Sequence, residues 1–235
     1  MNIHYFETLP STSITAAEMA KEGAPHLTAV VAKTQTAGRG RLTRQFFSPQ
    51  GGLYVTIVLR TTLSPAQYGA ITPYAALAVH RAMYRTCGVR TQIKWVNDLL
   101  LDGKKVCGIL AESGSDQNGT PYILLGIGIN TGDTVFPAEL AEIATSIPEC
   151  DKDALLHAIL EELDGVERAV HNGNWLDEYR AHSAVIGREV NVIEGARTTR
   201  ATALDIAKSG ALKVCFEDGT CGELYGAEIS LRLTQ

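Results

Sequence analysis

Two arginines alternate with two glycines in the segment Gly38-Arg39-Gly40-Arg41, which follows a β-branched stretch at 28–31 that is typical of a strand. Arginine carries a permanent charge on a planar group that matches carboxylates and phosphates, and glycine lets the backbone approach a ligand closely. A loop of this kind is a candidate clamp for an anion. A solvated surface loop has the same composition, so the segment alone does not decide between the two.

A lysine and a carboxylate are expected to meet in a hairpin further along the chain. Asp102-Gly103 lies between two apolar runs and predicts a two-residue type I′ turn, which pairs Leu101 with Lys104. Continued without a break, this register pairs Leu100 with Lys105 and Asp98 with Cys107. Because opposed residues share a face, one face is expected to carry Lys94, Asp98, Lys105 and Cys107, and the other Trp95, Asn97, Lys104 and Gly108. Lys105 beside Asp98 is then a plausible site, and Lys104 a solvated turn lysine.

Three hydroxyl residues, Ser11-Thr12-Ser13, precede an alanine-rich helical segment. Thr15 and Glu18 have the spacing of a capping box, so we expect the helix to open at Thr15. Capping then accounts for Thr15 and for Ser13 at most. Ser11 and Thr12 are left as candidate ligand-binding residues.

Taken in order, these segments resemble the signature blocks of biotin protein ligases. The resemblance covers nearly the whole chain and rests on six stretches: Ser11-Thr12-Ser13, Gln35 to Arg41, Lys94-Trp95-Val96-Asn97-Asp98, Lys105 to Leu110, Gly126-Ile127-Gly128-Ile129-Asn130, and Gly226 to Arg232. The chain departs from the family pattern at Ser13 (usually Asn), Leu42 (often Arg), Phe46 (often Trp) and Val96 (Pro). These departures bear on the shape of the ligand pocket.

The resemblance implies an ATP-dependent ligase, a biotin–[biotin carboxyl-carrier protein] ligase. Such an enzyme makes biotinyl-5′-AMP from biotin and ATP with Mg²⁺ and passes the biotin to a lysine of a biotin carboxyl carrier domain. Binding roles are thereby implied for Ser11, Thr12, Ser13, Gln35, Gly38, Arg39, Gly40, Arg41, Lys105, Asn130 and Arg232. Arg39, Arg41 and Lys105 would stabilise the charge on the transferring group, and Asp98 would orient Lys105 or contact metal. Asn130 would lie towards the adenosine and Arg232 near the nucleotide.

The order of apolar runs predicts an α+β fold with a mixed, largely antiparallel sheet and flanking helices, because hairpins outnumber strand-helix-strand units. The resemblance implies a sheet similar to that of class II aminoacyl-tRNA synthetases. After Gly187 the pattern changes to short strands broken by glycines, which predicts a small SH3-like β-barrel. We therefore expect a catalytic domain at 1–186 and a C-terminal domain at 187–235.

Composition limits the partners. A length of 235 residues accommodates one sizeable domain with a small one, and a net charge of −5 argues against binding to nucleic acid. Larger family members carry an N-terminal helix-turn-helix domain, and the position of Ser11 leaves no room for one, so we expect a short form that does not bind DNA. Residues 1–10 lack the pattern of a signal peptide, and no apolar run is long enough to span a membrane. A homodimer formed through a sheet edge stays possible.

The five cysteines are expected to be reduced thiols of a cytoplasmic protein. A two-residue turn at Asp218-Gly219 would pair Phe216 with Cys221 and Cys215 with Gly222, which puts the two cysteines out of register and on opposite faces. The histidines have no metal-ligand spacing, and no metal site is expected. Those on predicted helices (His80, His157, His171 and His182) are expected to be solvated or to cap helices. Trp95 and Trp175 are expected to lie in the core.

Two alternatives to a biotin ligase stay open. Lipoate or octanoate ligases and transferases share the fold, although they lack the Gly-Arg-Gly-Arg loop in this form. A non-catalytic sensor that binds biotin or a nucleotide would use the same pocket without turnover. Selectivity for biotin over lipoate and octanoate would distinguish a biotin ligase from the first alternative. Biotin-dependent release of pyrophosphate would exclude the second.

Overall fold

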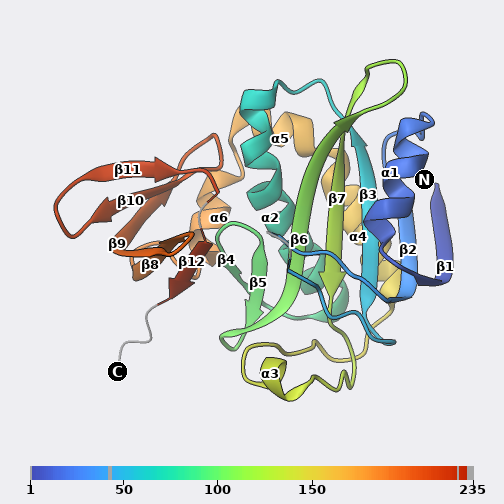
Figure 1. Cartoon of the computed structure of the whole chain (residues 1–235), viewed down its shortest axis with the longest axis horizontal. Helices are drawn as coiled ribbons and strands as arrows, with labels where there is room; N and C mark the ends of the chain where they lie inside the picture. Colours follow the sequence, from blue (N-terminus) through green and yellow to red (C-terminus); the bar gives the residue numbers. More distant parts are fainter. Residues whose placement is uncertain (1, 42–43, 227, 232–235) are drawn as a thin grey trace.

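A computed structural model of the chain describes residues 2–41, 44–226 and 228–231. Seven strands form one sheet in the order β1-β2-β3-β7-β6-β5-β4, which crosses the centre of Figure 1. Their bounds are β1 Ile3–Leu9, β2 Thr28–Gln35, β3 Leu53–Arg60, β4 Gln92–Lys94, β5 Asp98–Leu101, β6 Lys104–Ser115 and β7 Pro121–Ile129. Only β1 and β2 pair in parallel. The prediction of a mixed, largely antiparallel sheet is confirmed.

Strand β1 was not expected from the sequence. It lies at the edge of the sheet, none of its side chains is fully buried, and polar and apolar residues do not alternate along it. The hydroxyl oxygens of Thr8 and Thr34 lie 2.9 Å apart, and Lys33 Nζ lies 2.7 Å from Glu7 Oε1. Pairing with β2 therefore stabilises β1 although its sequence lacks the alternation of polar and apolar residues that predicts a strand.

Helices cover both faces of the sheet. They are α1 Thr12–Lys21, the 3₁₀ helix η1 Pro65–Ala70, α2 Ile71–Cys87, α3 Ala138–Ala141, α4 Lys152–Asp164, α5 Val166–Asn172 and α6 Leu176–His182. On one face, buried side chains such as Ile57 and Leu125 pack in one cluster with α2 and α4. On the other, Val58 and Leu124 pack against Ala16 and Ala20 of α1. Because α1 is short, it leaves part of its face open. In the described part of the chain, no helix is long and apolar enough to cross a membrane.

Helix α1 begins three residues before the predicted start at Thr15. Ser11 has extended backbone geometry, and its side-chain oxygen accepts a hydrogen bond from the Ser13 amide at 3.3 Å, so Ser11 is the N-cap. The capping-box spacing of Thr15 and Glu18 lies inside the helix. Ser11, which the sequence suggested as a ligand-binding residue, therefore caps the helix. Thr12 and Ser13 lie in the first turn.

The hairpin of β5 and β6 has the predicted turn but not the predicted register throughout. Leu101 pairs with Lys104 and Leu100 with Lys105, as expected, and the register then shifts by one residue. A β-bulge at Val106 pairs Asp98 with Gly108 instead of Cys107. Cys107 turns into the core, where burial raises the pKa of its thiol. The prediction that Lys105 and Asp98 share a face is confirmed. Cys107 and Gly108 each lie on the face opposite to the one predicted.

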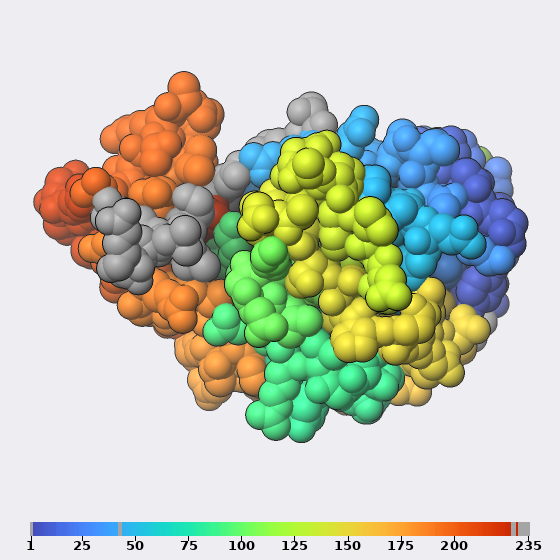
Figure 2. Space-filling model, turned by 90° about the horizontal axis from the view of Figure 1, so that it is seen from below, coloured from blue at the N-terminus to red at the C-terminus, as the bar shows by residue number. Residues whose placement is uncertain are grey.

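A second sheet of five antiparallel strands follows, in the order β11-β10-β9-β8-β12. Its strands are β8 Glu189–Glu194, β9 Arg197–Ile206, β10 Leu212–Phe216, β11 Cys221–Leu224 and β12 Glu228–Leu231. This sheet is the small β domain that the sequence predicts after Gly187. It stands to one side of the main body in both views, orange to red (Figures 1 and 2).

Cys215 and Cys221 form a disulfide across β10 and β11, which corrects the prediction that all five cysteines are free. The loop of the hairpin has three residues, 217–219, because the Phe216 amide donates to the Thr220 carbonyl. Gly219 has a φ of +83°, as the last position of such a loop requires. The longer loop puts the two cysteines directly opposite one another. Cys87, Cys107 and Cys150 are free thiols.

The two sheets share one hydrophobic core. Val190, Val214 and Ile229 of the second sheet belong to the same buried cluster as the strands of the first. Trp95 Nε1 donates to the Gly210 carbonyl at 2.9 Å, between β9 and β10. Gly210 fits there because a Cβ would lie 2.3 Å from the carbonyl oxygen of Gly69. The prediction that the two tryptophans are core residues is confirmed, since 3% of Trp95 and 1% of Trp175 are exposed.

His80 is buried within α2, which corrects the expectation of a solvated or capping residue. Its Nδ1 lies 2.9 Å from Thr91 Oγ1, and its ring centroid lies 4.1 Å from that of His182. Burial, followed by repulsion from His182, lowers the pKa of His80 to about 4, and attraction to Glu178 opposes this only in part. The protein therefore holds the imidazole neutral.

This buried histidine should make the protein less stable in weak acid. Its pKa rises to about 6.5 in the unfolded chain, so the unfolded state takes up the proton first as the pH falls. We expect the free energy of unfolding to fall between about pH 6.5 and pH 4 and His80→Gln, which keeps a hydrogen-bonding group for Thr91, to lose less over the same interval. Urea unfolding at a series of pH values measures both. Parallel curves for the two proteins would show that another group governs the acid response.

Candidate functional site

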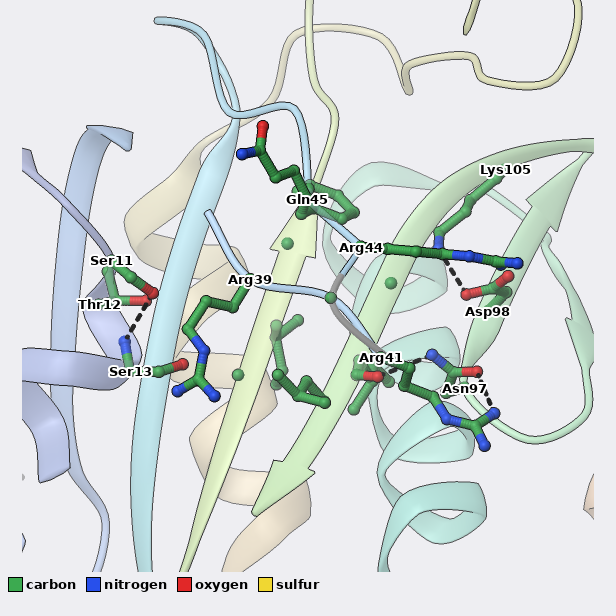
Figure 3. A pocket seen from close by; sticks show the side chains of 18 of the residues that line it. Ser11, Thr12, Ser13, Arg39, Arg41, Arg44, Gln45, Asn97, Asp98 and Lys105 are labelled. Carbon is green, nitrogen blue, oxygen red and sulfur yellow. Dashed lines mark hydrogen bonds and ion pairs between the residues drawn. The ribbon is translucent and has the colours of Figure 1, made fainter. Parts of the chain in front are cut away.

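A cleft of about 160 Å³ opens on the face of the sheet that α1 leaves uncovered. Figure 3 shows Ser11, Thr12 and Ser13 on one side and Lys105, Asp98, Asn97 and Arg41 on the other, with the loop that follows β2 crossing between them. The cleft is lined from α1, from that loop, from β4 to β7 and from Ile229 of β12. Segments from both ends of the chain therefore build one site.

Three glycines leave room for the cleft above the sheet. Gly108, Gly126 and Gly128 line it from neighbouring strands and have no side chain to fill it. The ring of Phe46 lies over this floor, since a Cβ on Gly128 would be 2.5 Å from Phe46 Cε1. Lys105 Nζ lies 5.7 Å from the centre of the same ring. Gly108 and Gly128 therefore make room for the Phe46 ring and for the Lys105 side chain, which lie directly on this floor.

Neutral hydrogen-bonding groups occupy one end of the cleft. Gln35 Oε1 accepts from the Thr12 amide at 2.9 Å and from Thr12 Oγ1 at 3.2 Å, and Gln35 Nε2 donates to Ser48 Oγ at 2.8 Å. Beneath them, Thr56 Oγ1 lies 2.8 Å from Thr12 Oγ1 and 3.2 Å from Ser13 Oγ. These contacts fix the amide and the hydroxyls in place before any ligand binds.

The two loop arginines are held by different parts of the protein. Arg39 Nη2 donates to Glu112 Oε1 of β6 at 2.7 Å. Arg41 Nη2 donates to the Gly226 carbonyl at 2.6 Å, and Arg41 Nη1 lies 3.5 Å from Asn97 Oδ1. Asn97 is itself fixed, because its Nδ2 donates to the Ile109 carbonyl at 2.9 Å. Arg41 thus connects the loop both to the strand hairpin and to the C-terminal sheet.

Lys105 is fastened at its backbone and at its ammonium group. Its Nζ lies 2.7 Å from Asp98 Oδ1. Its amide donates to the Ile143 carbonyl and its carbonyl accepts from the Thr145 amide, each at 2.9 Å. The segment between β7 and α4, lime to yellow in Figure 2, lies beside the β5–β6 hairpin in this way. Such backbone contacts fix the point from which the lysine side chain enters the cleft.

Positive charge dominates the lining. Five basic residues line the cleft, and Asp98 is the one acidic residue among the described lining side chains; the basic residues are Arg39, Arg41, Arg44, Lys94 and Lys105. Glu112 pairs with Arg39, and Asp98 pairs with Lys105. A surplus of cations in a partly enclosed site attracts and stabilises anions. No group of three or more histidine, cysteine or acidic side chains in the described ranges could hold a metal ion.

Most of the residues singled out from the sequence meet in this cleft. Those that line it are Ser11, Thr12, Ser13, Gln35, Arg39, Gly40, Arg41, Asp98 and Lys105. Gly38 lies behind it, where a Cβ would come within 2.5 Å of the Phe46 carbonyl oxygen. Asn130 lies outside the lining and is 4% exposed; its Nδ2 donates to the Thr145 carbonyl at 3.0 Å, and its Oδ1 is buried without a partner. Arg232 lies outside the described residues, as does Leu42.

Several contributors were not identified from the sequence. Thr56 sits in the middle of an apolar strand and Ser48 in a loop, and neither position carries a recognisable signal. Asn97 was assigned to the opposite face. The lining residues Arg44, Gln45 and Lys94 were not among the expected site residues, although Lys94 was correctly placed beside Asp98.

Comparisons with known proteins are consistent with this geometry. Residues 5–130 match the model of the biotin/lipoate A/B protein ligase family, and residues 185–232 match that of the biotin protein ligase C-terminal domain. The bifunctional ligase/repressor BirA of Bacillus subtilis is 40% identical over 148 residues, which are 62% of this chain and 46% of that protein. The biotin–[acetyl-CoA-carboxylase] ligase of Mycobacterium tuberculosis is 31% identical over 203 residues, 81% of this chain and 73% of that one.

Solved structures extend the likeness to the whole fold. The biotin protein ligase of Aquifex aeolicus in complex with biotin and ATP superposes with a TM-score of 0.83 at 24% identity, over 99% of both chains. The aligned part of the present chain spans about half the length of several curated relatives, including the Bacillus subtilis protein. The fold and the family are therefore established, and the activity rests on the site.

The hydroxyl cluster gives a test of this site that needs no ligand. Thr56→Val keeps the shape of the side chain but removes the shared partner of Thr12 and Ser13, so we expect a loss of about 1–2 kcal/mol in the free energy of unfolding. Thr28→Val is the matched control, because Thr28 Oγ1 is buried without a partner and its removal should be neutral or stabilising. Denaturant unfolding of both variants measures the difference. Equal losses would mean that the network around Thr56 contributes nothing.

Proposed function

The chain belongs to the biotin/lipoate A/B protein ligase family, and we propose that it is a biotin protein ligase. In this proposal it forms biotinyl-5′-AMP from biotin and ATP and transfers the biotin to one lysine of a biotin carboxyl carrier domain. The observation that carries the proposal is the two-ended cleft. The hydroxyl groups of Ser11 to Ser13 lie on one side, the cations Arg41, Arg44 and Lys105 lie on the other (Figure 3), and three glycines line the floor of the cleft.

The neutral end suits the ureido ring of biotin. A ureido group donates two hydrogen bonds and accepts others, and the groups around Ser11, Thr12 and Gln35 can do both. Gln35 keeps one N–H for a ligand after its contacts with Thr12 and Ser48. The Phe46 ring, which covers Gly108 and Gly128, would pack against the apolar part of the ligand. Its carboxylate would extend towards the cations.

The cationic end suits the first chemical step. A carboxylate oxygen of biotin attacks the α-phosphorus of ATP, a P–O bond forms, and the bond to the β-phosphate breaks to release pyrophosphate. Both reactants are anions, so the step needs positive charge that offsets their repulsion and stabilises the transferring group. Lys105, Arg39 and Arg41 would supply it, with Lys94 and Arg44 nearby. Asp98, 2.7 Å from Lys105 Nζ, would hold that ammonium group in position.

Mg²⁺ would enter with the nucleotide. The protein offers one lining carboxylate, Asp98, rather than a cage, and Mg²⁺ is commonly held by phosphate oxygens with one or two carboxylates and several waters. When bound, the ion would shield charge on the polyphosphate. Asn130, which does not line the cleft and has a buried Oδ1 without a partner, stays the proposed residue on the adenosine side. Arg232, in the C-terminal segment, stays the proposed residue on the nucleotide side.

In the second step, the ε-amine of the carrier lysine attacks the acyl carbon, AMP leaves, and the amine loses a proton. The adenylate has to be kept from water until then. Arg41 fastens the loop to the Gly226 carbonyl, which supports a role for this arginine in covering the intermediate. We also propose that the partner is a carrier protein of a biotin-dependent carboxylase and that DNA is not a partner. The proposed location is the cytoplasm, and the proposed assembly is a monomer or a homodimer.

The division of labour between 1–186 and 187–235 is also a proposal. The shared core and the Trp95–Gly210 hydrogen bond mean that removal of the second sheet would expose buried side chains of the first. Its contribution is therefore better tested by single substitutions at Ile229, which lines the cleft, than by truncation after Ile186.

Exchange of radiolabelled pyrophosphate into ATP tests the function directly. We expect exchange that depends on biotin and not on lipoate or octanoate, and transfer of biotin to a carrier domain but not to a carrier whose acceptor lysine is replaced by arginine. Exchange that depends on lipoate or octanoate would assign the protein to the other branch of the family. No exchange with any acid, together with measurable biotin binding, would make it a sensor.

Lys105 and Lys104 should differ sharply in the same assay. Lys105→Ala removes a positioned cation, which typically costs about 3 kcal/mol or roughly a hundredfold in the rate of adenylation. Lys104 Nζ makes an exposed hydrogen bond to the Ala141 carbonyl at 2.9 Å, so Lys104→Ala should cost about 0.5 kcal/mol or less. Rates are compared at saturating biotin and ATP, after both variants are shown to melt at similar temperatures. Comparable losses would remove Lys105 from the proposed mechanism.

A further inference from the structure

A second hollow lies among the helices, on the far side of the sheet from the cleft. It has a volume of about 220 Å³, and its side chains come from α2, from α5 and from the turn that leads into α6. None of its lining residues lines the cleft. α2 packs against the sheet face opposite to the one that carries Thr56, Gly126 and Gly128. The hollow is therefore separate from the proposed active site.

Trp175, one of the lining residues, carries a buried donor without a partner in the described part of the chain. The residue is 1% exposed, and the donor is its Nε1. An indole N–H can only donate. A buried donor without an acceptor has lost its hydrogen bonds to water, so such groups are normally satisfied by protein, water or a ligand.

Two further donors at the rim have no partner either. Arg168 and Asn174 both line the hollow and are exposed, and among the residues that the structure describes neither side chain makes an ion pair or a hydrogen bond. Tyr74, which also lines the hollow, donates its hydroxyl to the Glu162 carbonyl at 3.0 Å and is already engaged. Unpaired donors thus gather around one space.

Carboxylates are kept away from this space. Arg81 lines the hollow and pairs with Glu162 and Glu178, neither of which lines it. Glu167 of α5 is engaged elsewhere, accepting from the Thr62 amide at 2.5 Å. The lining therefore carries two guanidinium groups and no acidic side chain. A ligand for it must accept hydrogen bonds and carry negative charge.

We infer that this hollow binds a small oxyanion of the inorganic phosphate class. Arg168 would form the charged contact, and Asn174 and the Trp175 N–H would donate to the remaining oxygens. The inference does not depend on the proposed function, since it uses none of the residues of the cleft.

Inorganic phosphate is the probe, added at constant ionic strength with chloride as the replaced anion. We expect a saturable change in the fluorescence of the two tryptophans and a rise in Tm, because a ligand that binds the folded state stabilises it. Phosphate could also enter the cationic cleft, so the Lys105→Ala variant, which lacks one positive charge of the cleft, is measured in parallel. The saturable signal should survive in Lys105→Ala.

Arg168→Ala should weaken phosphate binding by at least about tenfold, as expected for loss of one charge-assisted contact of 1.4 kcal/mol or more. Arg188→Ala is the matched control, since it removes an exposed arginine that does not line the hollow and should leave binding unchanged.

Trp175→Phe removes the buried donor while keeping an aromatic ring, and its phosphate-dependent rise in Tm should be smaller. No saturable binding to the unmodified protein would mean that the hollow holds water only. Binding that Lys105→Ala abolishes and Arg168→Ala leaves intact would place the anion in the cleft and overturn the inference.

Discussion

The bulge at Val106 is the constraint on which the site depends. Without it, Cys107 would stand beside Asp98 on the open face, and Gly108 would lie in the core. The extra residue turns Cys107 inward and brings Gly108 beneath Lys105, where a Cβ would lie 2.9 Å from Lys105 Nζ. The inserted residue thus leaves the face beneath the Lys105 ammonium group free of a side chain.

The start of β6 is also an attachment point for another segment. Pairing of β6 with β7 begins at Cys107, and the backbone groups of Lys105, before that point, pair with Ile143 and Thr145. Asn130 then fastens Thr145 from the end of β7. The segment after β7 is therefore tied to the lysine of the cleft through backbone hydrogen bonds, and the buried amide of Asn130 closes this arrangement.

The sequence predicts those features that local chemistry determines. The Asp102-Gly103 turn fixes the pairs next to it, so Leu101 and Lys104 are placed correctly, whereas a bulge further along leaves no mark in the residue types. Ser11 and Thr15 both have capping side chains, and only the path of the chain out of β1 decides between them. The prediction that Cys215 and Cys221 do not pair was wrong because the loop between their strands is one residue longer than expected.

Contacts between distant segments are not predicted in this way. His80 is buried by α6, which packs against α2 from far along the chain, and helical spacing does not indicate that contact. In the cleft, charged loop residues were recognisable from their types, while Thr56 acts only through neighbours that tertiary folding brings to it.

The long range of the sheet pairing has a consequence for synthesis of the protein. Leu53 of β3 pairs with Ile129 of β7, and the cleft is lined from Ser11 at one end of the chain to Ile229 at the other. A nascent chain that is still emerging from the ribosome can form α1 and the β5–β6 hairpin, because these use neighbouring residues, but it cannot complete the cleft until β12 has left the exit tunnel. Ligand binding would therefore begin only after β12 has emerged, and a chain terminated before β12 would carry the arginine loop and the lysine of the cleft without the wall that encloses them.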